Sequence, residues 1–355
     1  METYRRLFWI QRVVILALLV GVGMSFPLWL NERTFPLIPI LPFTVPLNVI
    51  GAQVLLGGLA LSLLGAFFFA KQRFLIFLSV LLMMVVAFQD FNRLQPWFFQ
   101  YWTILVILIP LARSYKKYLD IEHLLFAVQV ALVSVYFFSG LFKFNDGFYN
   151  RVAHYLYSPI TGILIDSGPY LYPTTYVIPW LEIALALGLF VPKLRIFALI
   201  GGTLLHLAIL LLIGPLGMDE NSIIWPWNIA LIPILWLAFF RAKNYKPTLY
   251  LNKLEWPAKI IMVMVVILPF LNLKGWYNEH LSYELYSGRT FTPHLRYHHK
   301  LIKKTPDYLV PYTWKEGDSV YVNIYKWSME ENNTPPNSDI KVINMVQEKT
   351  LKKLQ

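Results

Sequence analysis

Long apolar runs, separated by short polar or basic segments, recur along most of this chain. A membrane-spanning helix needs about 20 apolar residues, with about 17–25 tolerated. Flanking tryptophans such as Trp97 and Trp225 are expected to complete the shorter runs at the membrane interface. The pattern predicts an all-α polytopic membrane protein with about nine transmembrane helices. The predicted spans are 9–30, 47–70, 74–88, 97–112, 124–142, 176–191, 196–213, 225–240 and 260–273.

The pattern changes near the C-terminus. Residues 319–325 alternate apolar and polar positions as a half-buried strand does, and residues 315–318 before them are typical of a turn. Residues 345–355 suit either a short basic helix or a disordered end. We therefore expect a transmembrane domain over residues 1–273 and a small α+β extracytoplasmic C-terminal domain over residues 274–355.

Composition excludes a soluble protein. Hydrophobic residues make up 57% of the chain and charged residues 14%, whereas soluble domains have about 45–50% and about 25%. The chain contains no cysteine, which excludes disulfides, thiolate-bound metals, iron–sulfur clusters and cysteine nucleophiles. The net charge of +11 could suit a nucleic-acid-binding protein, but the basic residues form no recognisable nucleic-acid motif. We therefore expect the lipid bilayer to surround the protein, and we expect no nucleic acid among its partners.

The basic residues also orient the predicted spans. One alternating set of connections holds 15 Lys and Arg residues, and the opposite set holds four. The positive-inside rule places the richer set, together with the N-terminus, in the cytoplasm. Nine spans then place the C-terminal domain outside, and a bacterial inner membrane with a periplasmic C-terminus is the favoured location. The richer set is Arg5, Arg6, Arg12, Lys71, Arg73, Arg113, Lys116, Lys117, Lys193, Arg195, Arg241, Lys243, Lys246, Lys253 and Lys259.

Polar residues gather toward the outer ends of the spans. Glu182 and His206 lie inside two neighbouring antiparallel spans, at roughly 9 Å and roughly 10 Å below the outer surface. Ionisable groups at such depth are costly and are candidates for function. Asp90, Lys143 and Asn145 lie at the outer ends of further spans. The sequence predicts a polar pocket near the outer leaflet, although Glu182 and His206 could instead be a buried pair that holds helices together.

Two other kinds of function receive less support. A transporter is disfavoured because the sequence has no evident internal repeat of the kind that many transporters contain. His294 and His298 would share one face of a helix, as in some metal sites. However, Pro293 and the strand-like surroundings argue against a helix there, so no metal site is predicted.

Three short motifs stand out between residues 136 and 240. Residues 136–144 end a predicted helix with aromatic residues, a glycine and a lysine, and residues 154–159 read His-Tyr-Leu-Tyr-Ser-Pro. Glu182 is followed by Gly-Leu-Phe at 188–190, by Arg195 just before the next span and by His206 within that span. In order and spacing these motifs resemble the family of vitamin K-dependent γ-glutamyl carboxylase and its bacterial HTTM-domain relatives. The wider DoxX-like membrane group shares a looser version.

The resemblance implies an activity and residues to perform it. Lys143 would be a catalytic base that deprotonates a bound quinol of the vitamin K type, and His154 on the outer connection would donate a hydrogen bond to that quinol. The resemblance therefore implies a carboxylase-like lyase that uses a lipid-soluble quinone as its cofactor. The chain departs from the family in having Phe142 where the carboxylase has a second basic residue. The residues that would bind the ligand or support the site are Asp90, Tyr136, Asn145, Glu182 and His206.

The competing interpretation is a non-enzymatic accessory or scaffold subunit of an envelope membrane-protein complex. In that case the polar cluster is structural, and the basic C-terminal domain docks a membrane or periplasmic protein partner. Residues 282–290 are dense in aromatic and hydrogen-bonding groups, which suits such an interface. A monomer that carries a quinone would favour the enzyme, and a stoichiometric protein partner would favour the scaffold.

Overall fold

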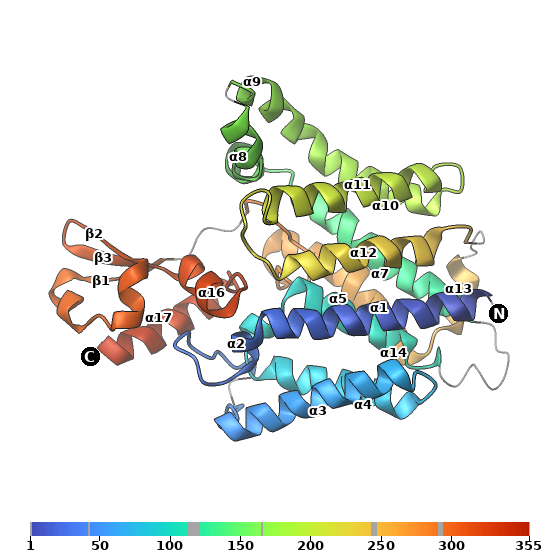
Figure 1. Cartoon of the computed structure of the whole chain (residues 1–355), viewed down its shortest axis with the longest axis horizontal. Coiled ribbons are helices and arrows are strands. Elements are labelled where there is room, and N and C mark those ends of the chain that lie inside the picture. The colour runs from blue at the N-terminus through green and yellow to red at the C-terminus, as the bar shows by residue number, and fades with distance from the viewer. Residues whose placement is uncertain are drawn as a thin grey trace.

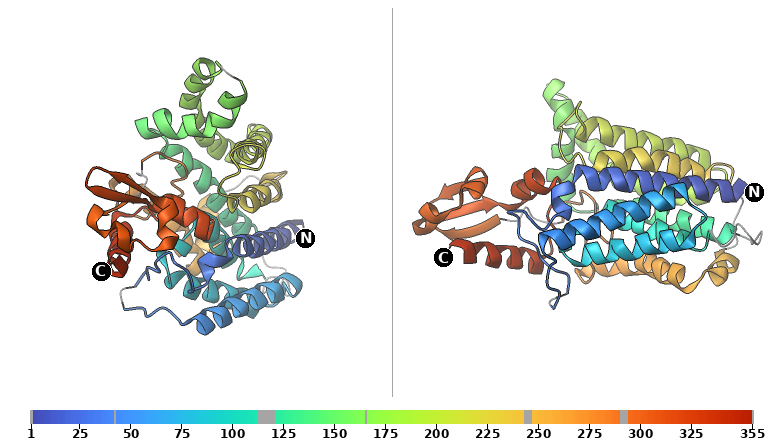
Figure 2. Two further views of the ribbon diagram at one scale, coloured as in Figure 1. Left: turned by 60° about the vertical axis from the view of Figure 1, so that its left-hand side comes forward. Right: turned by 60° about the horizontal axis from the view of Figure 1, so that its bottom comes forward.

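The protein is an elongated helical bundle with a small helix-and-sheet part at one end, as the computed structural model shows (Figure 1). The N-terminus lies at the other end of the bundle, and Figure 2 shows the same arrangement from two further sides. The structure describes residues 2–41, 43–111, 121–164, 166–242, 247–289 and 294–354. Sequence positions discussed above that fall outside these ranges are Arg113, Lys116, Lys117, Lys243, Lys246, Thr290 and Pro293.

All nine predicted spans fall on helices, but their lengths differ. Three are apolar helices of 13 to 16 residues, namely α4 (Arg73–Phe88), α5 (Pro96–Leu108) and α12 (Ile224–Phe239). A span needs about 17–25 residues, and these three helices are shorter than that. The chain is a multi-pass membrane protein, but the helix lengths do not confirm all nine predicted spans. Within the described ranges, six helical stretches are long and apolar enough to cross a membrane: α1 (Glu2–Met24), α3 (Val49–Phe68), α7 (Glu122–Leu141), Gly168–Phe190, α11 (Arg195–Ile213) and Trp256–Lys274.

Shorter helices build the connections and the two composite stretches. The stretch that ends at Phe190 contains α9 (Gly168–Leu171), η3 (Tyr172–Val177) and α10 (Ile178–Phe190). The last stretch contains α14 (Trp256–Met262), η4 (Val263–Ile267), α15 (Leu268–Leu271) and η5 (Asn272–Lys274). The connections hold α2 (Phe26–Trp29), η1 (Phe91–Arg93), η2 (Phe148–Val152), α8 (Ala153–Ile163) and α13 (Pro247–Lys253).

Helix α7 is the centre of the bundle. Of its most apolar 18-residue window, 83% is buried, whereas the other five long stretches are 28–44% buried. A helix that is apolar all round and enclosed on all sides belongs to the interior of a bundle. Helices α5, α10 and α12 pack directly against α7. Polar side chains on α7 therefore have to find partners on neighbouring helices.

The C-terminal part contains a three-stranded antiparallel sheet in the order β1-β3-β2. Its strands are β1 (His294–His298), β2 (Thr313–Glu316) and β3 (Ser319–Asn323), and Gly317 turns the chain between β2 and β3 with a φ of 55°. The predicted strand at 319–325 ends at Asn323, because the Asn323 side chain accepts a hydrogen bond from the Lys326 N–H and so caps the next helix. The remaining elements are η6 (His299–Lys304), η7 (Asp307–Tyr312), α16 (Ile324–Asn332) and α17 (Ile340–Leu354).

The loop after α2 completes the core of the C-terminal part. The ring of Phe35 lies 4.7 Å from that of Trp327, and both side chains are buried. Glu331 accepts hydrogen bonds from the backbone N–H groups of Thr34 (2.5 Å) and Phe35 (3.0 Å). The C-terminal part thus shares its core with residues from the opposite end of the sequence. The predicted boundary between a transmembrane domain and a C-terminal domain at residue 273 stays a prediction.

The predicted docking segment at 282–290 is used inside the protein, so the prediction of an external interface there was wrong for the part that is described. Ser282 and Tyr283 are 0% exposed and Ser287 is 3% exposed. The Glu284 carboxylate accepts hydrogen bonds from Asn272 (2.6 Å) and Ser287 (2.6 Å). The aromatic and hydrogen-bonding groups of this segment bind it to the membrane helices.

Candidate functional site

One face of α7 and its C-terminal turn carries the polar residues of the predicted site. Tyr136, Ser139, Gly140 and Lys143 follow one another at spacings of three, one and three residues, which aligns them on a helix. Gly140 allows α10 to come close, because a Cβ atom there would lie 2.7 Å from the backbone oxygen of Pro179. The glycine therefore brings the polar face of α7 within reach of α10.

Lys143 and Glu182 form a buried ion pair between the end of α7 and α10. The Lys143 Nζ lies 2.8 Å and 3.1 Å from the two carboxylate oxygens of Glu182. It also donates to the Ser139 Oγ at 2.6 Å and to the Ser139 backbone oxygen at 3.1 Å. An ammonium group has three N–H donors and no acceptor, so these contacts occupy all of them. The two residues are 4% and 6% exposed.

A second chain of hydrogen bonds joins α7, α11 and α12. The Tyr136 hydroxyl lies 2.5 Å from His206 Nε2, and His206 Nδ1 lies 2.7 Å from the Asn228 Oδ1. The Asn228 amide nitrogen donates to the Ile224 backbone oxygen at 2.8 Å, so its oxygen is free to accept from His206. This order makes Nδ1 the protonated nitrogen of a neutral imidazole, and Nε2 accepts from Tyr136.

The polar residues thus converge on α7, and their side chains are enclosed by the protein. Lys143, Glu182 and His206 are at most 6% exposed and are hydrogen-bonded to protein groups. Neither of the two cavities described below is lined by any of them. The arrangement can fix the positions of α7, α10, α11 and α12, and it uses the hydrogen-bonding capacity of the Lys143 amine on groups of the protein itself.

His154 lies on α8, apart from the ion pair. Its ring stacks on that of Tyr172, with 3.7 Å between centroids and 23° between planes. In the described part of the chain no hydrogen bond or ring contact joins His154 to Lys143. The cavity beside His154 has a volume of about 350 Å³. Its lining residues are Tyr149, Asn150, His154, Pro169, Tyr172, Pro173, Thr175 and Tyr176.

Asp90 belongs to a different cluster, at the C-terminal ends of α2 and α4. It is 0% exposed, forms an ion pair with Arg33 and accepts the backbone N–H of Ile38 at 3.1 Å. Beside it Arg93, 1% exposed, donates to the backbone oxygens of Leu28 (3.0 Å) and Trp29 (2.9 Å). These groups hold the loop that carries Phe35 into the C-terminal core. Arg33 and Arg93 are two of the four basic residues in the poorer set of predicted connections, and the sequence gives no sign of their burial.

Asn145 ties the end of α7 to the segment before the sheet. Its amide nitrogen donates to the backbone oxygens of Phe142 and Ser287, both at 2.8 Å, and its oxygen accepts the Phe148 N–H at 3.0 Å. The backbones of Gly147 and Gly288 touch here, and a Cβ on Gly147 would lie 2.1 Å from the Gly288 oxygen. Asn145 therefore acts through packing, away from the Lys143 amine.

A metal site finds no geometric support among the residues that the structure describes. No group of three or more His, Asp or Glu side chains there could hold a metal ion. His294 and His298 lie on β1, on its exposed face. Four residues along a strand span about 13 Å, which is too far for the two imidazoles to share one ion.

The comparisons with known proteins favour a different family from the one that the motifs resemble. A family model described as methylamine utilisation protein MauE matches residues 121–218. The match covers less than a third of the chain. It includes α7, α8, α10 and α11, and with them every predicted site residue except Asp90. Searches of curated proteins and of solved structures found no match.

The predicted relation to HTTM proteins and the vitamin K-dependent carboxylase was therefore wrong. The match to MauE covers the same motifs, and the structure gives them a packing explanation. Gly140 is where α7 meets α10, and Lys143 neutralises the charge of Glu182. The carboxylase-like activity has no support. The quinol was expected only because of the resemblance to the carboxylase, so this expectation also loses its basis.

Proposed function

We propose that this protein is a non-enzymatic accessory membrane protein, of the kind described by the MauE family model, that serves an envelope membrane-protein complex. The observation that carries the proposal is the buried Lys143–Glu182 pair within the matched residues 121–218. The N–H donors of the Lys143 ammonium group are occupied by Glu182 and Ser139, and both residues of the pair are almost fully buried. Its arrangement suits a rigid support.

The C-terminal part supplies the surface for a partner in this proposal. On the sheet, the rings of His294 and Trp314 lie 4.9 Å apart, and Trp314 stacks on Tyr321 at 5.3 Å. Trp314 is 41% exposed. Tryptophan and tyrosine are enriched where proteins bind one another, so this face is the docking surface that we propose in place of residues 282–290.

The proposed orientation has the N-terminus in the cytoplasm and the C-terminal part in the periplasm of a bacterial inner membrane. The basic residues support it, because those that begin α1 and α11 lie at the bundle end opposite the sheet (Figure 1). Positive charge marks the cytoplasmic side of membrane proteins. A periplasmic sheet would then meet a partner that is anchored in, or exported across, the same membrane.

A charge-neutral replacement of the ion pair tests whether Lys143 has a structural or a chemical role. We compare Lys143→Met with the double variant Lys143→Met/Glu182→Gln in a strain that lacks the chromosomal copy. Removing one partner leaves a buried charge unpaired, which costs about 3–5 kcal/mol, whereas replacing both partners is often neutral. The single variant is therefore expected to lose folded protein in the membrane, and the double variant to regain it.

The functional measurements are complementation of the deletion strain and the amount of partner that co-purifies per molecule. The proposal expects a stoichiometric partner with the wild type, and expects the double variant to recover both complementation and partner. Trp314→Ala should lose the partner while the protein stays folded. If the double variant folds but fails to complement, Lys143 is needed for chemistry and the accessory function is refuted.

A further inference from the structure

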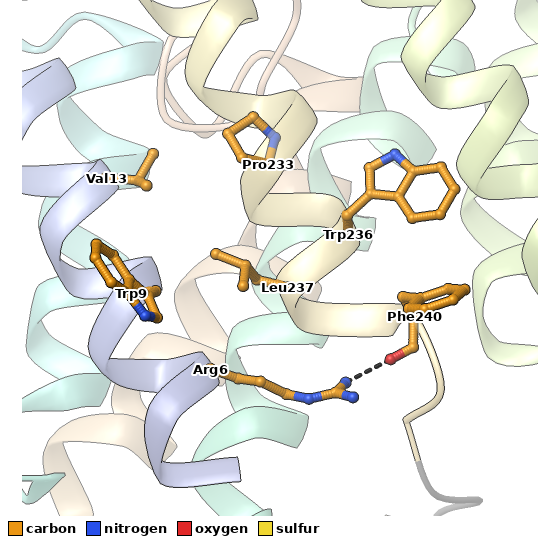
Figure 3. A pocket seen from close by; sticks show the side chains of 7 residues that line it. All are labelled: Arg6, Trp9, Val13, Pro233, Trp236, Leu237 and Phe240. Carbon is orange, nitrogen blue, oxygen red and sulfur yellow. Dashed lines mark hydrogen bonds between the residues drawn. The ribbon is translucent and has the colours of Figure 1, made fainter. Parts of the chain in front are cut away.

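An apolar groove runs between α1 and α12 at the bundle end that holds the N-terminus (Figure 3). Its volume is about 590 Å³, within the range of about 300–1,000 Å³ that is typical of small-ligand sites. Helix α1 contributes Arg6, Trp9 and Val13, three and four residues apart and so on one face. The lining residues from α12 and its end are Pro233, Trp236, Leu237 and Phe240.

The walls of the groove are apolar and partly rigid. Trp9 is 52% exposed, and Trp236 is fixed by a hydrogen bond from its indole N–H to the Thr203 hydroxyl at 3.0 Å. Pro233 lies inside α12 and cannot donate a backbone hydrogen bond to the preceding turn, a feature that commonly kinks a helix. Tryptophans are enriched at the level of the lipid headgroups. The groove therefore faces lipid near one membrane surface.

Two guanidinium groups stand at the polar end of the groove. Arg6 donates to the Phe240 backbone oxygen at 2.5 Å and is paired with Glu2, whose side chain is 77% exposed. Arg241 follows with a positive φ of 52°, and its guanidinium lies 5.1 Å from the centre of the Phe240 ring. Among the described residues that adjoin the groove, Arg6 and Arg241 face the single carboxylate of Glu2, which favours an anion at this end.

We propose that this groove is a binding site for an anionic phospholipid, with an acyl chain between Trp9 and Trp236 and the phosphate at Arg6 and Arg241. Basic pockets between membrane helices recognise anionic headgroups in this way. Glu2 is exposed enough for a phosphate to share Arg6 with it or to replace it. A helix of a partner protein is disfavoured as the occupant, because it would need carboxylates at this one position, whereas every anionic phospholipid has a phosphate beside its acyl chains.

Native mass spectrometry of the full chain in detergent tests the proposal with two probes that have the same acyl chains, phosphatidylglycerol and phosphatidylethanolamine. Phosphatidylglycerol is expected to bind at least fivefold more tightly. Arg241→Gln is expected to weaken its binding about fivefold, which corresponds to ~1 kcal/mol for one basic residue at a membrane surface. Val13→Trp fills the groove and is expected to abolish binding of both lipids.

Arg73→Gln is the matched control. It removes the same charge from an exposed residue at the start of α4 that lies outside the groove and pairs with Glu255 at 3.5 Å. Binding to this variant should equal binding to the wild type. Equal affinity for the two lipids, an equal loss with Arg73→Gln and Arg241→Gln, or unchanged binding with Val13→Trp each overturn the proposal. Loss of a protein partner with Val13→Trp, at unchanged lipid binding, would make the groove a helix-packing surface instead.

Discussion

Replacing Gly140 by alanine should destabilise the protein by forcing α7 and α10 apart. A Cβ at this position would lie 2.7 Å from the Pro179 backbone oxygen, 3.0 Å from Ile183 Cγ1 and 3.1 Å from Glu182 Cβ. Ordinary van der Waals contact begins at 3.4 Å, so α10 has to retreat by about 0.7 Å at the tightest contact. Overpacking of this kind costs about 1–3 kcal/mol.

The same movement would weaken the ion pair. A retreat of about 0.7 Å would lengthen the shorter Lys143–Glu182 contact from 2.8 Å to about 3.5 Å, beyond the usual hydrogen-bond distance. The cost of Gly140→Ala should therefore shrink when Lys143 and Glu182 have been replaced by Met and Gln. Residues that share a contact show such non-additive free energies, of about 0.5–3 kcal/mol.

Thermal unfolding in detergent, followed by tryptophan fluorescence, measures the effect, since the chain has 12 tryptophans and no cysteine for a thiol-reactive dye. In domains of about 150–250 residues, 1 kcal/mol shifts Tm by about 2–4 °C, and Gly140→Ala should lower Tm by at least that order. Gly57→Ala on α3 is the control, because a Cβ there meets no atom within 4 Å. Equal Tm values for the two variants would refute the close approach of α7 and α10.

Two further predictions concern the junction of the bundle and the C-terminal part. Asp90→Asn breaks a buried ion pair with Arg33, at a cost of about 3–5 kcal/mol, and should speed proteolytic release of the C-terminal part, whereas Arg73→Gln should leave its rate unchanged. Burial lowers the pKa of His280 below 6.5, although Glu279 opposes this shift. The unfolded chain therefore binds the additional proton, and stability should fall as pH drops below about 6.5. His280→Gln should flatten this dependence of Tm on pH, and an unchanged slope would contradict it.

The helices could be predicted from the sequence because the apolar runs are long and the membrane demands satisfied backbone groups. The sequence also placed Glu182 and His206 on neighbouring helices, and α10 and α11 do pack against each other. Their partners differ, however: Glu182 binds Lys143, and His206 binds Tyr136. Sequence spacing fixes how deep a residue lies in the membrane, but not which side of its helix faces which neighbour.

Contacts between distant segments could not be predicted in this way. Arg33 and Asp90 are 57 residues apart, and Phe35 packs on Trp327 from the other end of the chain. Residues 282–290 illustrate a second difficulty. Aromatic and hydrogen-bonding side chains serve internal and external contacts equally well, so composition alone could not reveal that Tyr283 is buried within the protein.

The energetics of the ion pair explain why a lysine at the end of a helix was a poor guide to catalysis. Before Lys143 could accept a proton from a ligand, its ammonium group would first have to give up a proton, which would leave the buried Glu182 carboxylate without its counter-charge. Breaking a buried pair costs about 3–5 kcal/mol. A buried pair that joins the end of α7 to α10 is consistent with a protein whose exposed surfaces, and not its polar core, meet its partners.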